Sequence, residues 1–330
     1  MILKKGEVVE QSRRAMTQWE DLWKKNAVHN SKYYKAENNT IRELLFKGAG
    51  KTVVLIAFGD SFEQQLKTLQ EMRLQNREFD VICCDKCISF LGFAPDYCVL
   101  ADASINKKWL EGVDTSKTTL ISNICGNTDW SDMWKGRKMY FTNKDNINTQ
   151  DIFAPISGCY DFIPASSNVG NAAVVLASSV FGYEQIILLG YDFCWSDNYY
   201  AFHNRHDSTT KDKKYYMSHR IAINNNGKIV YTSENLTFSA KWLSDYLRTF
   251  PINVVNASQN SLLGYAPTRD LRKQLEIARK RELTKQDKEN MINKIIQHVK
   301  VNNKDELLTK KNVVGLVAEI IPKESMWLIE

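Results

Sequence analysis

The stretch that decides the fold is KTVVLIAFGDSF, residues 51–62. Its first eight residues form one continuous apolar and β-branched run, which is typical of a strand buried on both faces of a parallel sheet. The run ends at Gly59, Asp60 and Ser61, and residues 62–75 continue with apolar side chains at helical spacing. We therefore expect a strand, a tight turn and a helix in succession, which is the building unit of an α/β protein.

The same unit recurs along the chain. The small-residue segment 169–180 and the segment 232–250 have the pattern of helices. Further strands are predicted at residues 79–84, 96–101, 118–121, 138–141, 185–190 and 252–256. Strands that alternate with helices require crossover connections, so the sequence predicts a doubly wound, mostly parallel Rossmann-like sheet with helical N- and C-terminal additions, in an α/β class that includes GT-A variants.

Four segments follow from this pattern. We expect an N-terminal helical segment over residues 1–47 and a Rossmann-like catalytic domain over residues 48–266. Within that domain residues 196–227 are polar and aromatic without a clear period, and so long a connection is usually a functional lid. We expect residues 267–330 to form a charged helical appendix, with an apolar stretch at 312–321.

Composition excludes several classes of protein. The 330 residues are 43% hydrophobic and 25% charged, which is ordinary for a globular chain, and the net charge of +6 favours anionic ligands without indicating a nucleic-acid-binding protein. Seven cysteines are an odd and sparse set, which indicates a reducing compartment. The charged N-terminus does not resemble a signal peptide, and the apolar runs are far shorter than the ~18 residues of a membrane span. We expect a cytoplasmic protein with no transmembrane segment.

Two motifs resemble a phosphate-binding loop and a zinc site, but each lacks residues that such a site requires. GAGKT at residues 48–52 resembles the end of a phosphate-binding loop, but Leu45 stands where the first glycine belongs, and the motif precedes a strand instead of following one. Cys83, Cys84 and Cys87 contain one Cys-x-x-Cys without a second pair at zinc spacing. Buried free cysteines are the expectation, and no metal site is predicted.

Polar residues follow five of the predicted strands. Each of them alone would serve as a helix N-cap, but together they favour a ligand crevice, because ligands of parallel α/β sheets bind at the carboxyl ends of the strands. These residues are Gly59, Asp60, Ser61, Asp85, Asp102, Ser166, Ser167, Asn168 and Asp192.

The predicted lid contains three of the five histidines, His203, His206 and His219. A histidine in a lid suits a general base because its pKa lies near working pH, and a solvent-exposed loop histidine is the alternative. The lid also contains Tyr199, Tyr200, Tyr215 and Tyr216, whose hydroxyls suit contacts to a phosphate or a sugar, or simple packing of the loop.

Several blocks resemble the MptE-like and motility-associated-factor (Maf) superfamily over roughly residues 50–265. The most specific block is SNVGNAA at 167–173 with FGYEQIILLGYD at 181–192. It is preceded by DVICCD at 80–85 and FAPDYCVLAD at 93–102, and followed by NGKIVYT at 226–232, Trp242 and VNAS at 255–258.

The core is also similar to bacterial sialyltransferases that use CMP-activated sialic acid, through GYDF at 190–193, YAF at 200–202 and MSH at 217–219. The resemblance implies that Tyr200 donates to the departing CMP phosphate and that His219 deprotonates the acceptor hydroxyl, with His203 and His206 as alternative bases. Asp192 is the third catalytic candidate. The implied donor-binding residues are Gly59, Asp60, Ser61, Asp85, Asp102, Ser167, Asn168, Gly170 and Asn171, the last four at a helix N-terminus.

The sequence departs from that pattern at three positions. Asp60 replaces a proline of the family's glycine-rich turn, Asp85 replaces an asparagine, and Cys194 stands where a second leaving-group tyrosine is expected.

Three functions remain open. The first is an inverting glycosyltransferase that moves a nonulosonic sugar from a CMP-type nucleotide-sugar donor to a protein or glycan hydroxyl and requires no cofactor. The second is an MptE-like 6-hydroxymethylpterin diphosphokinase that uses ATP and Mg²⁺, with Asp85, Asp102 and Asp192 as candidate carboxylates. The third, which the departures motivate, is a catalytically degenerate interaction module. A homo-oligomer is compatible with each.

Overall fold

The computed structural model describes residues 5–35, 39–75, 78–144, 149–164, 168–195, 220–250, 252–287, 289–290 and 293. An eight-stranded, wholly parallel sheet forms its centre, in the order β10-β7-β1-β2-β3-β4-β5-β6. The strands are β1 (Thr52–Ile56), β2 (Phe79–Cys84), β3 (Tyr97–Leu100), β4 (Thr119–Asn123), β5 (Lys138–Lys144), β6 (Phe162–Pro164), β7 (Gln185–Leu189) and β10 (Val254–Asn256). The predicted doubly wound α/β fold is confirmed.

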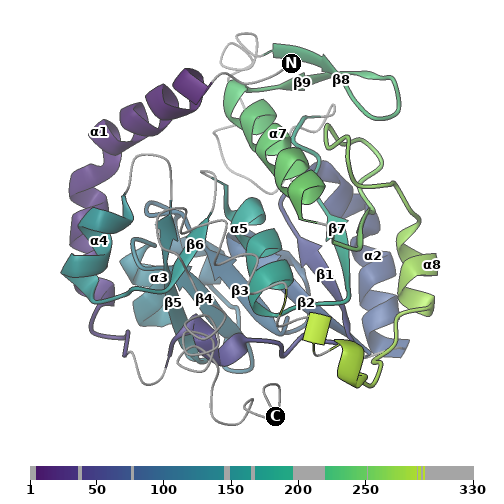
Figure 1. Cartoon of the computed structure of the whole chain (residues 1–330), viewed down its shortest axis with the longest axis horizontal. Helices are drawn as coiled ribbons and strands as arrows, with labels where there is room; N and C mark the ends of the chain where they lie inside the picture. The colour runs from purple at the N-terminus through teal and green to yellow at the C-terminus, as the bar shows by residue number, and fades with distance from the viewer. Residues whose placement is uncertain are drawn as a thin grey trace.

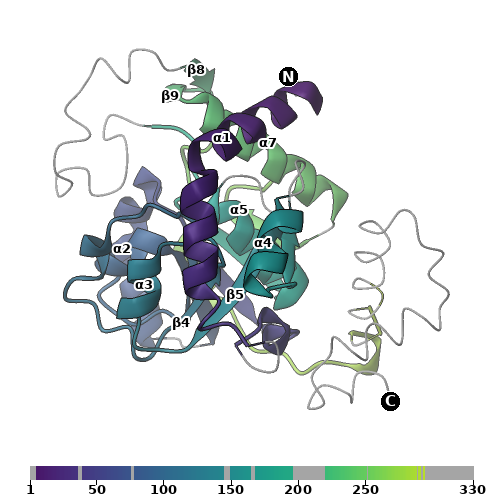
Figure 2. The ribbon, with the colours of Figure 1, turned by 90° about the vertical axis from the view of Figure 1, so that its left-hand side faces the viewer.

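Helices cover both faces of this sheet (Figures 1 and 2). The α-helices are α1 (Lys5–Asn30), α2 (Asp60–Gln75), α3 (Thr128–Met133), α4 (Gln150–Ser157), α5 (Val169–Val175), α7 (Glu234–Thr249) and α8 (Leu271–Glu276). Short helical turns are η1 (Ile41–Leu44), η2 (Asp85–Phe90), η3 (Lys107–Leu110) and η4 (Leu176–Val180), the last a π-helical continuation of α5. Figure 2 shows α2 and α3 on one side of the sheet, α4, α5 and α7 on the other, and α1 passing between them.

The sequence pattern of the central strand explains its place. All five residues of β1 are buried, and the strand is paired on both sides, with Val54 opposite Val81 of β2 and Ile187 of β7. A strand that is buried on both faces needs a continuous apolar run, and that is what residues 52–56 supply.

The short helices α3 and α4 and the strands β6, β8 (Arg220–Ile223) and β9 (Ile229–Thr232) were not predicted from the sequence. The three-residue strand β6 is too short to show a period. A separate antiparallel hairpin pairs β8 with β9, although the sequence predicts a loop through residue 227. This hairpin alternates exposed and buried side chains, but Ile221, Ile223 and Ile229 are the exposed ones, so its pattern is the reverse of the usual arrangement.

The two ends of the chain were both predicted to be helical, and they differ in how far the described residues are helical. The helical N-terminal segment is confirmed by α1 and η1. Beyond residue 267 the described helix α8 is only six residues long, and residues 277–284 have no regular secondary structure. Leu271, Leu275 and Ala278 pack into the main core, so this part of the predicted appendix is attached to the sheet.

Among the described residues, no helix combines the length and apolar character that crossing a membrane requires.

Candidate functional site

The order of the strands creates a switch point between β1 and β7. From β1 the chain builds the sheet outward through β2, β3, β4, β5 and β6, and β7 then returns to the other side of β1. At such a point the connections leave the neighbouring strands in opposite directions, and a crevice opens beyond the carboxyl ends of the strands. The segments that follow β1 and β7 therefore build the candidate site.

Glycines allow these two segments to touch. The backbone N–H of Ala57 donates to Leu189 O at 2.8 Å, and that of Gly59 donates to Gly190 O at 3.0 Å, so the pairing of β1 and β7 continues past both strands. A Cβ atom on Gly59 would lie 2.5 Å from Gly190 O and 2.6 Å from Asp192 Oδ2. The predicted site residue Gly59 is therefore required by the close approach of the two turns.

Asp192 links the turn after β7 to the turn after β1. Its carboxylate accepts hydrogen bonds from Ser61 N at 2.9 Å and from Ser61 Oγ at 2.5 Å. Ser61 Oγ lies 2.9 Å from Ser258 Oγ, beyond the end of β10, and Ser258 Oγ accepts from Tyr191 N at 3.0 Å. Residues that follow three strands thus form one buried polar network at the switch point.

Burial changes the proton affinity of this network. Asp192 is 2% exposed, and burial raises its pKa from 3.8 to about 6, while the hydrogen bonds from Ser61 act in the opposite direction. Asp60 is also buried, accepts from Gln64 Nε2 at 2.7 Å, and raises the pKa of Asp192 further through its charge. A buried carboxylate with a pKa near 6 is able to gain or lose a proton near neutral pH.

Asp85 and Asp102 form a second pair of carboxylates, at the ends of β2 and β3. Asp85 is buried and accepts from Lys86 N at 2.6 Å. Burial raises the pKa of Asp85, the charge and the backbone N–H of Lys86 lower it, and the charge of Asp102 raises it again. Asp102 is exposed and accepts from Ser104 N at 2.7 Å. The four aspartates thus follow four adjacent strands of the sheet, β7, β1, β2 and β3.

The start of α5 lies beside the same crevice. Asn168 caps the helix by accepting from Gly170 N at 2.8 Å, and Tyr191 Oη donates to Gly170 O at 2.9 Å. The Asn171 side chain is buried, and its Nδ2 donates to Ser239 O of α7 at 3.1 Å. Asn168 and Gly170 thus adjoin the turn after β7, and Asn171 joins α5 to α7.

The remaining predicted residues lie outside the described residues. They are Ser166, Ser167, Tyr199, Tyr200, His203, His206, Tyr215, Tyr216 and His219. The residues that flank the segment 196–219 are described. Trp195 N donates to Tyr231 O at 2.7 Å, and Arg220 pairs with Thr232, so both flanking residues lie beside β9. Thr232 Oγ1 in turn donates to Phe193 O at 2.8 Å, which ties β9 to the connection that follows β7.

Ser258 and Tyr191 were not among the predicted site residues. Ser258 follows the last strand, so the rule that selected the other strand ends would also have selected it. Asn256 Oδ1 accepts from Ser258 N at 2.9 Å, and its buried Nδ2 has no partner within the part of the chain that the structure describes. Tyr191 lies in the GYDF block that carries the resemblance, but its contact with Gly170, 21 residues away, appears only in the structure.

The cysteines behave as expected. All seven are buried and free, and burial raises the pKa of the Cys83, Cys84 and Cys87 thiols well above the usual value. Metal binding needs the thiolate, which this environment disfavours. Over the described ranges, no three His, Cys, Asp or Glu side chains converge in a way that would hold a metal ion.

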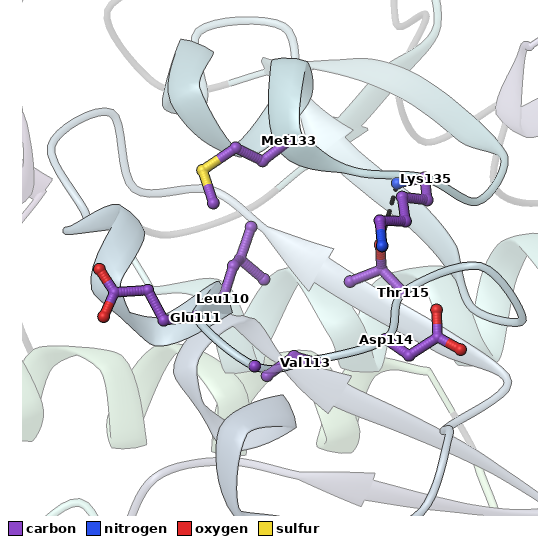
Figure 3. A pocket seen from close by; sticks show the side chains of 8 residues that line it. Leu110, Glu111, Val113, Asp114, Thr115, Met133 and Lys135 are labelled. Atoms are coloured by element: carbon purple, nitrogen blue, oxygen red, sulfur yellow. Dashed lines mark hydrogen bonds between the residues drawn. The ribbon is translucent and has the colours of Figure 1, made fainter.

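A shallow pocket of about 400 Å³ lies elsewhere (Figure 3). Its lining comes from residues 110–115 with Met133 and Lys135, which precede β4 and β5 in the chain, and Lys135 N donates to Thr115 Oγ1 at 2.9 Å. The pocket therefore contains none of the predicted site residues.

Comparisons with known proteins agree with this architecture. Residues 25–198, more than half of the chain, match a family model described as "6-hydroxymethylpterin diphosphokinase MptE-like". The fold is similar to that of a Maf glycosyltransferase from Magnetospirillum magneticum AMB-1, with a TM-score of 0.56 and 14% sequence identity over 84% of this chain and 42% of that one. The chain thus spans less than half the length of that protein. No match was found among curated proteins.

Proposed function

The chain belongs to the MptE-like family, and from this premise we propose that it is a glycosyltransferase that transfers a sialic-acid-like sugar from a CMP-type donor to a protein or glycan hydroxyl. The observation that carries the proposal is the buried network of Ser61, Asp192 and Ser258 at the switch point. A fold shared with a Maf glycosyltransferase supports the same activity.

The chemistry is assigned to the segment between Trp195 and Arg220. By the resemblance to sialyltransferases, His219 removes the proton from the acceptor hydroxyl, whose oxygen attacks the anomeric carbon with inversion. The bond from that carbon to the phosphate oxygen breaks, and Tyr200 donates a hydrogen bond to the departing CMP phosphate. The pairing of Trp195 and Arg220 with β9 supports this assignment, because β9 is itself bonded to the connection after β7 through Thr232 and Phe193.

In this proposal the network of Asp192 positions the donor. Ser61 and Asp192 hold the turns after β1 and β7 together, and Gly59 keeps side-chain atoms out of their contact. The beginning of α5, capped by Asn168, offers backbone N–H groups beside those turns. These N–H groups stabilise the negative charge of the donor phosphate, and the proposal requires no metal ion.

A diphosphokinase is the second candidate, and the positions of Asp85 and Asp102 after the neighbouring strands β2 and β3 favour it. Mg²⁺ is usually held by one or two carboxylates together with the phosphates of the substrate, and these residues supply two. The alcohol oxygen of 6-hydroxymethylpterin would attack the β-phosphorus of ATP, the bond to the α-phosphate oxygen would break, and AMP would leave.

Ligand-dependent thermal unfolding of the full chain distinguishes the candidates. We expect CMP to raise the unfolding temperature in EDTA as well as in Mg²⁺, whereas CDP, UDP and GDP have smaller effects. A ligand at a hundred times its Kd stabilises the folded state by about 2.7 kcal/mol, which is readily measured. With CMP-activated sugars as donors, His219→Ala should then abolish transfer while CMP still binds.

Other outcomes contradict the proposal. Stabilisation by ATP only with Mg²⁺, followed by release of AMP with a pterin alcohol, would establish the diphosphokinase. If no nucleotide changes the unfolding temperature and no transfer is detected, the chain is an interaction module. Unchanged transfer by His219→Ala would move the base to His203 or His206.

A further inference from the structure

Three half-buried aromatic side chains meet at the carboxyl ends of β1, β2 and β3. Phe58 follows β1, Phe90 ends η2 after β2, and Trp109 lies in η3 after β3. Their ring centroids are 5.6 Å apart for Phe58 and Phe90, 5.9 Å for Phe90 and Trp109, and 6.4 Å for Phe58 and Trp109. We refer to Phe58, Phe90 and Trp109 as the aromatic cluster.

The backbone holds the aromatic cluster in place. Phe58 directly precedes Gly59, whose turn is held against Gly190 by a hydrogen bond. Ser89 Oγ donates to the carbonyl oxygen of Trp109, which joins η2 to η3. The rings are therefore presented by three anchored segments, which follow the adjacent strands β1, β2 and β3.

Two lysines cover these rings. Lys86 Nζ lies 4.6 Å from the ring centroid of Phe58, and Lys108 Nζ lies 5.2 Å from that of Trp109. Lys108 is exposed, and a cation–π contact of an exposed lysine contributes little free energy. Lys86 is half-buried. The long side chain of an exposed lysine is therefore able to move aside when a planar group stacks on the ring.

We propose that the aromatic cluster is the subsite for the heteroaromatic base of the nucleotide. The inference rests on the proposed function, since it places one part of a nucleotide donor in the crevice already described. The base stacks on the ring of Trp109 or Phe58, and the displaced ammonium groups of Lys108 and Lys86 pair with phosphate oxygens. Stacking accepts any base, because every base has a π-face, so the base is selected by other contacts.

The test compares a nucleotide with its base-free fragment. The dissociation constants of CMP, ATP and ribose 5-phosphate are measured by calorimetry for the full-length wild type and for Trp109→Leu, which keeps an apolar side chain against η2 but has no aromatic face. We expect the variant to bind whichever nucleotide the wild type binds roughly 5- to 150-fold more weakly, with unchanged affinity for ribose 5-phosphate. Trp109→Phe retains a ring and should restore most of the affinity.

Trp23→Ala is the matched control. Trp23 is also half-buried and in edge-to-face contact with a phenylalanine, Phe153, but it lies on α1. Its replacement should leave the affinity for nucleotides unchanged. If Trp109→Leu does not fold, Phe58→Leu with the same ligands replaces it.

The results separate the two proposals. Equal affinities of wild type and Trp109→Leu for the nucleotide overturn the subsite and leave the proposed function intact. An equal loss of affinity for the nucleotide and for ribose 5-phosphate also overturns it, because the effect would then not depend on the base. If the wild type binds neither CMP nor ATP, the nucleotide-dependent function fails and the subsite fails with it.

Discussion

The carboxylate of Asp192 is almost completely withdrawn from water, and the hydrogen bonds from Ser61 only partly replace the lost hydration. Its pKa of about 6 therefore reflects an unfavourable free energy of burying the charge. At the scale of single residues, nothing in the sequence around Ser61 or Asp192 indicates a raised pKa. The burial of Asp192 and its hydrogen bonds from Ser61 arise only where the fold brings the two turns together.

Asp192→Asn should change how stability depends on pH. In the unfolded chain Asp192 loses its proton near pH 4, whereas in the folded protein it keeps the proton up to about pH 6. Between these values the folded state binds more protons, so the free energy of unfolding of the wild type falls as pH rises. Asparagine does not titrate. We therefore expect the difference in the free energy of unfolding between the two proteins to shift by about 2 kcal/mol in favour of the variant between pH 4 and pH 7.

Urea unfolding at pH 4, 5, 6 and 7 measures this shift. A constant offset between the two proteins across this range would show that the pKa of Asp192 is not raised by folding.

At the scale of elements, α1 is attached to the sheet by asparagines. Asn30 Nδ2 donates to Ile124 O and Gly126 O, both at 2.9 Å, and Asn26 Nδ2 donates to Ala103 O at 3.2 Å and Cys125 O at 3.1 Å. These carbonyls follow β3 and β4, where the backbone has left the sheet. The helix therefore supplies hydrogen bonds to carbonyl groups outside the strand ladders, although Ala103 O also accepts from Asn127 Nδ2 at 3.3 Å.

Asn30→Ala should destabilise this attachment. It removes both donors and leaves two buried carbonyl oxygens without these partners, so we expect the free energy of unfolding to fall by about 2 to 4 kcal/mol. Limited proteolysis within α1 should become faster at the same time. Val28→Ala, at a position of the same helix that is 60% exposed, should change stability by less than about 0.5 kcal/mol. Equal effects of the two substitutions would contradict this account of α1.

At the scale of the whole molecule, the sheet reverses its direction of growth where Gly190 meets Ala57. Gly190 has φ +75°, and a Cβ atom there would lie 2.0 Å from Ala57 O. Gly158, at the end of α4, has a similar φ of +73°, but a Cβ atom there would meet nothing within 4 Å. The two glycines share a backbone conformation and differ in their surroundings.

Gly190→Ala and Gly158→Ala therefore distinguish the free-energy cost of a left-handed backbone from the cost of a steric clash. We expect Gly158→Ala to cost about 1 to 2 kcal/mol, the cost of a left-handed backbone for a side-chain-bearing residue. Gly190→Ala adds a steric clash with a carbonyl of the central strand and should cost at least about 3 kcal/mol, or prevent folding. Both are measured by urea unfolding, and equal losses would mean that the turn after β7 relaxes without disturbing β1.

Much of the fold was predictable because its signals are local. The apolar run of β1, the matching runs of β2 and β7, and the helical spacing of α2 and α7 each lie within one short window of sequence. The hairpin β8–β9 was missed because its large apolar residues are exposed, Ile229 at 72%, so its pattern does not indicate which face packs. The role of α1 was missed because two asparagines, not its tryptophans, are its fully buried anchors.

The sequence by itself determined the class of fold, the order of strands and helices, and the residue types at the strand ends, because burial on a parallel sheet imposes a pattern on each segment separately. Only the tertiary structure decided which strand ends meet. Ser61 reaches Asp192 across 131 residues and Ser258 across 197, and Asp85 and Asp102 follow strands that are neighbours in the sheet. Such contacts depend on the order of strands in the sheet, and the burial that raises the pKa of Asp192 exists only once that sheet is assembled.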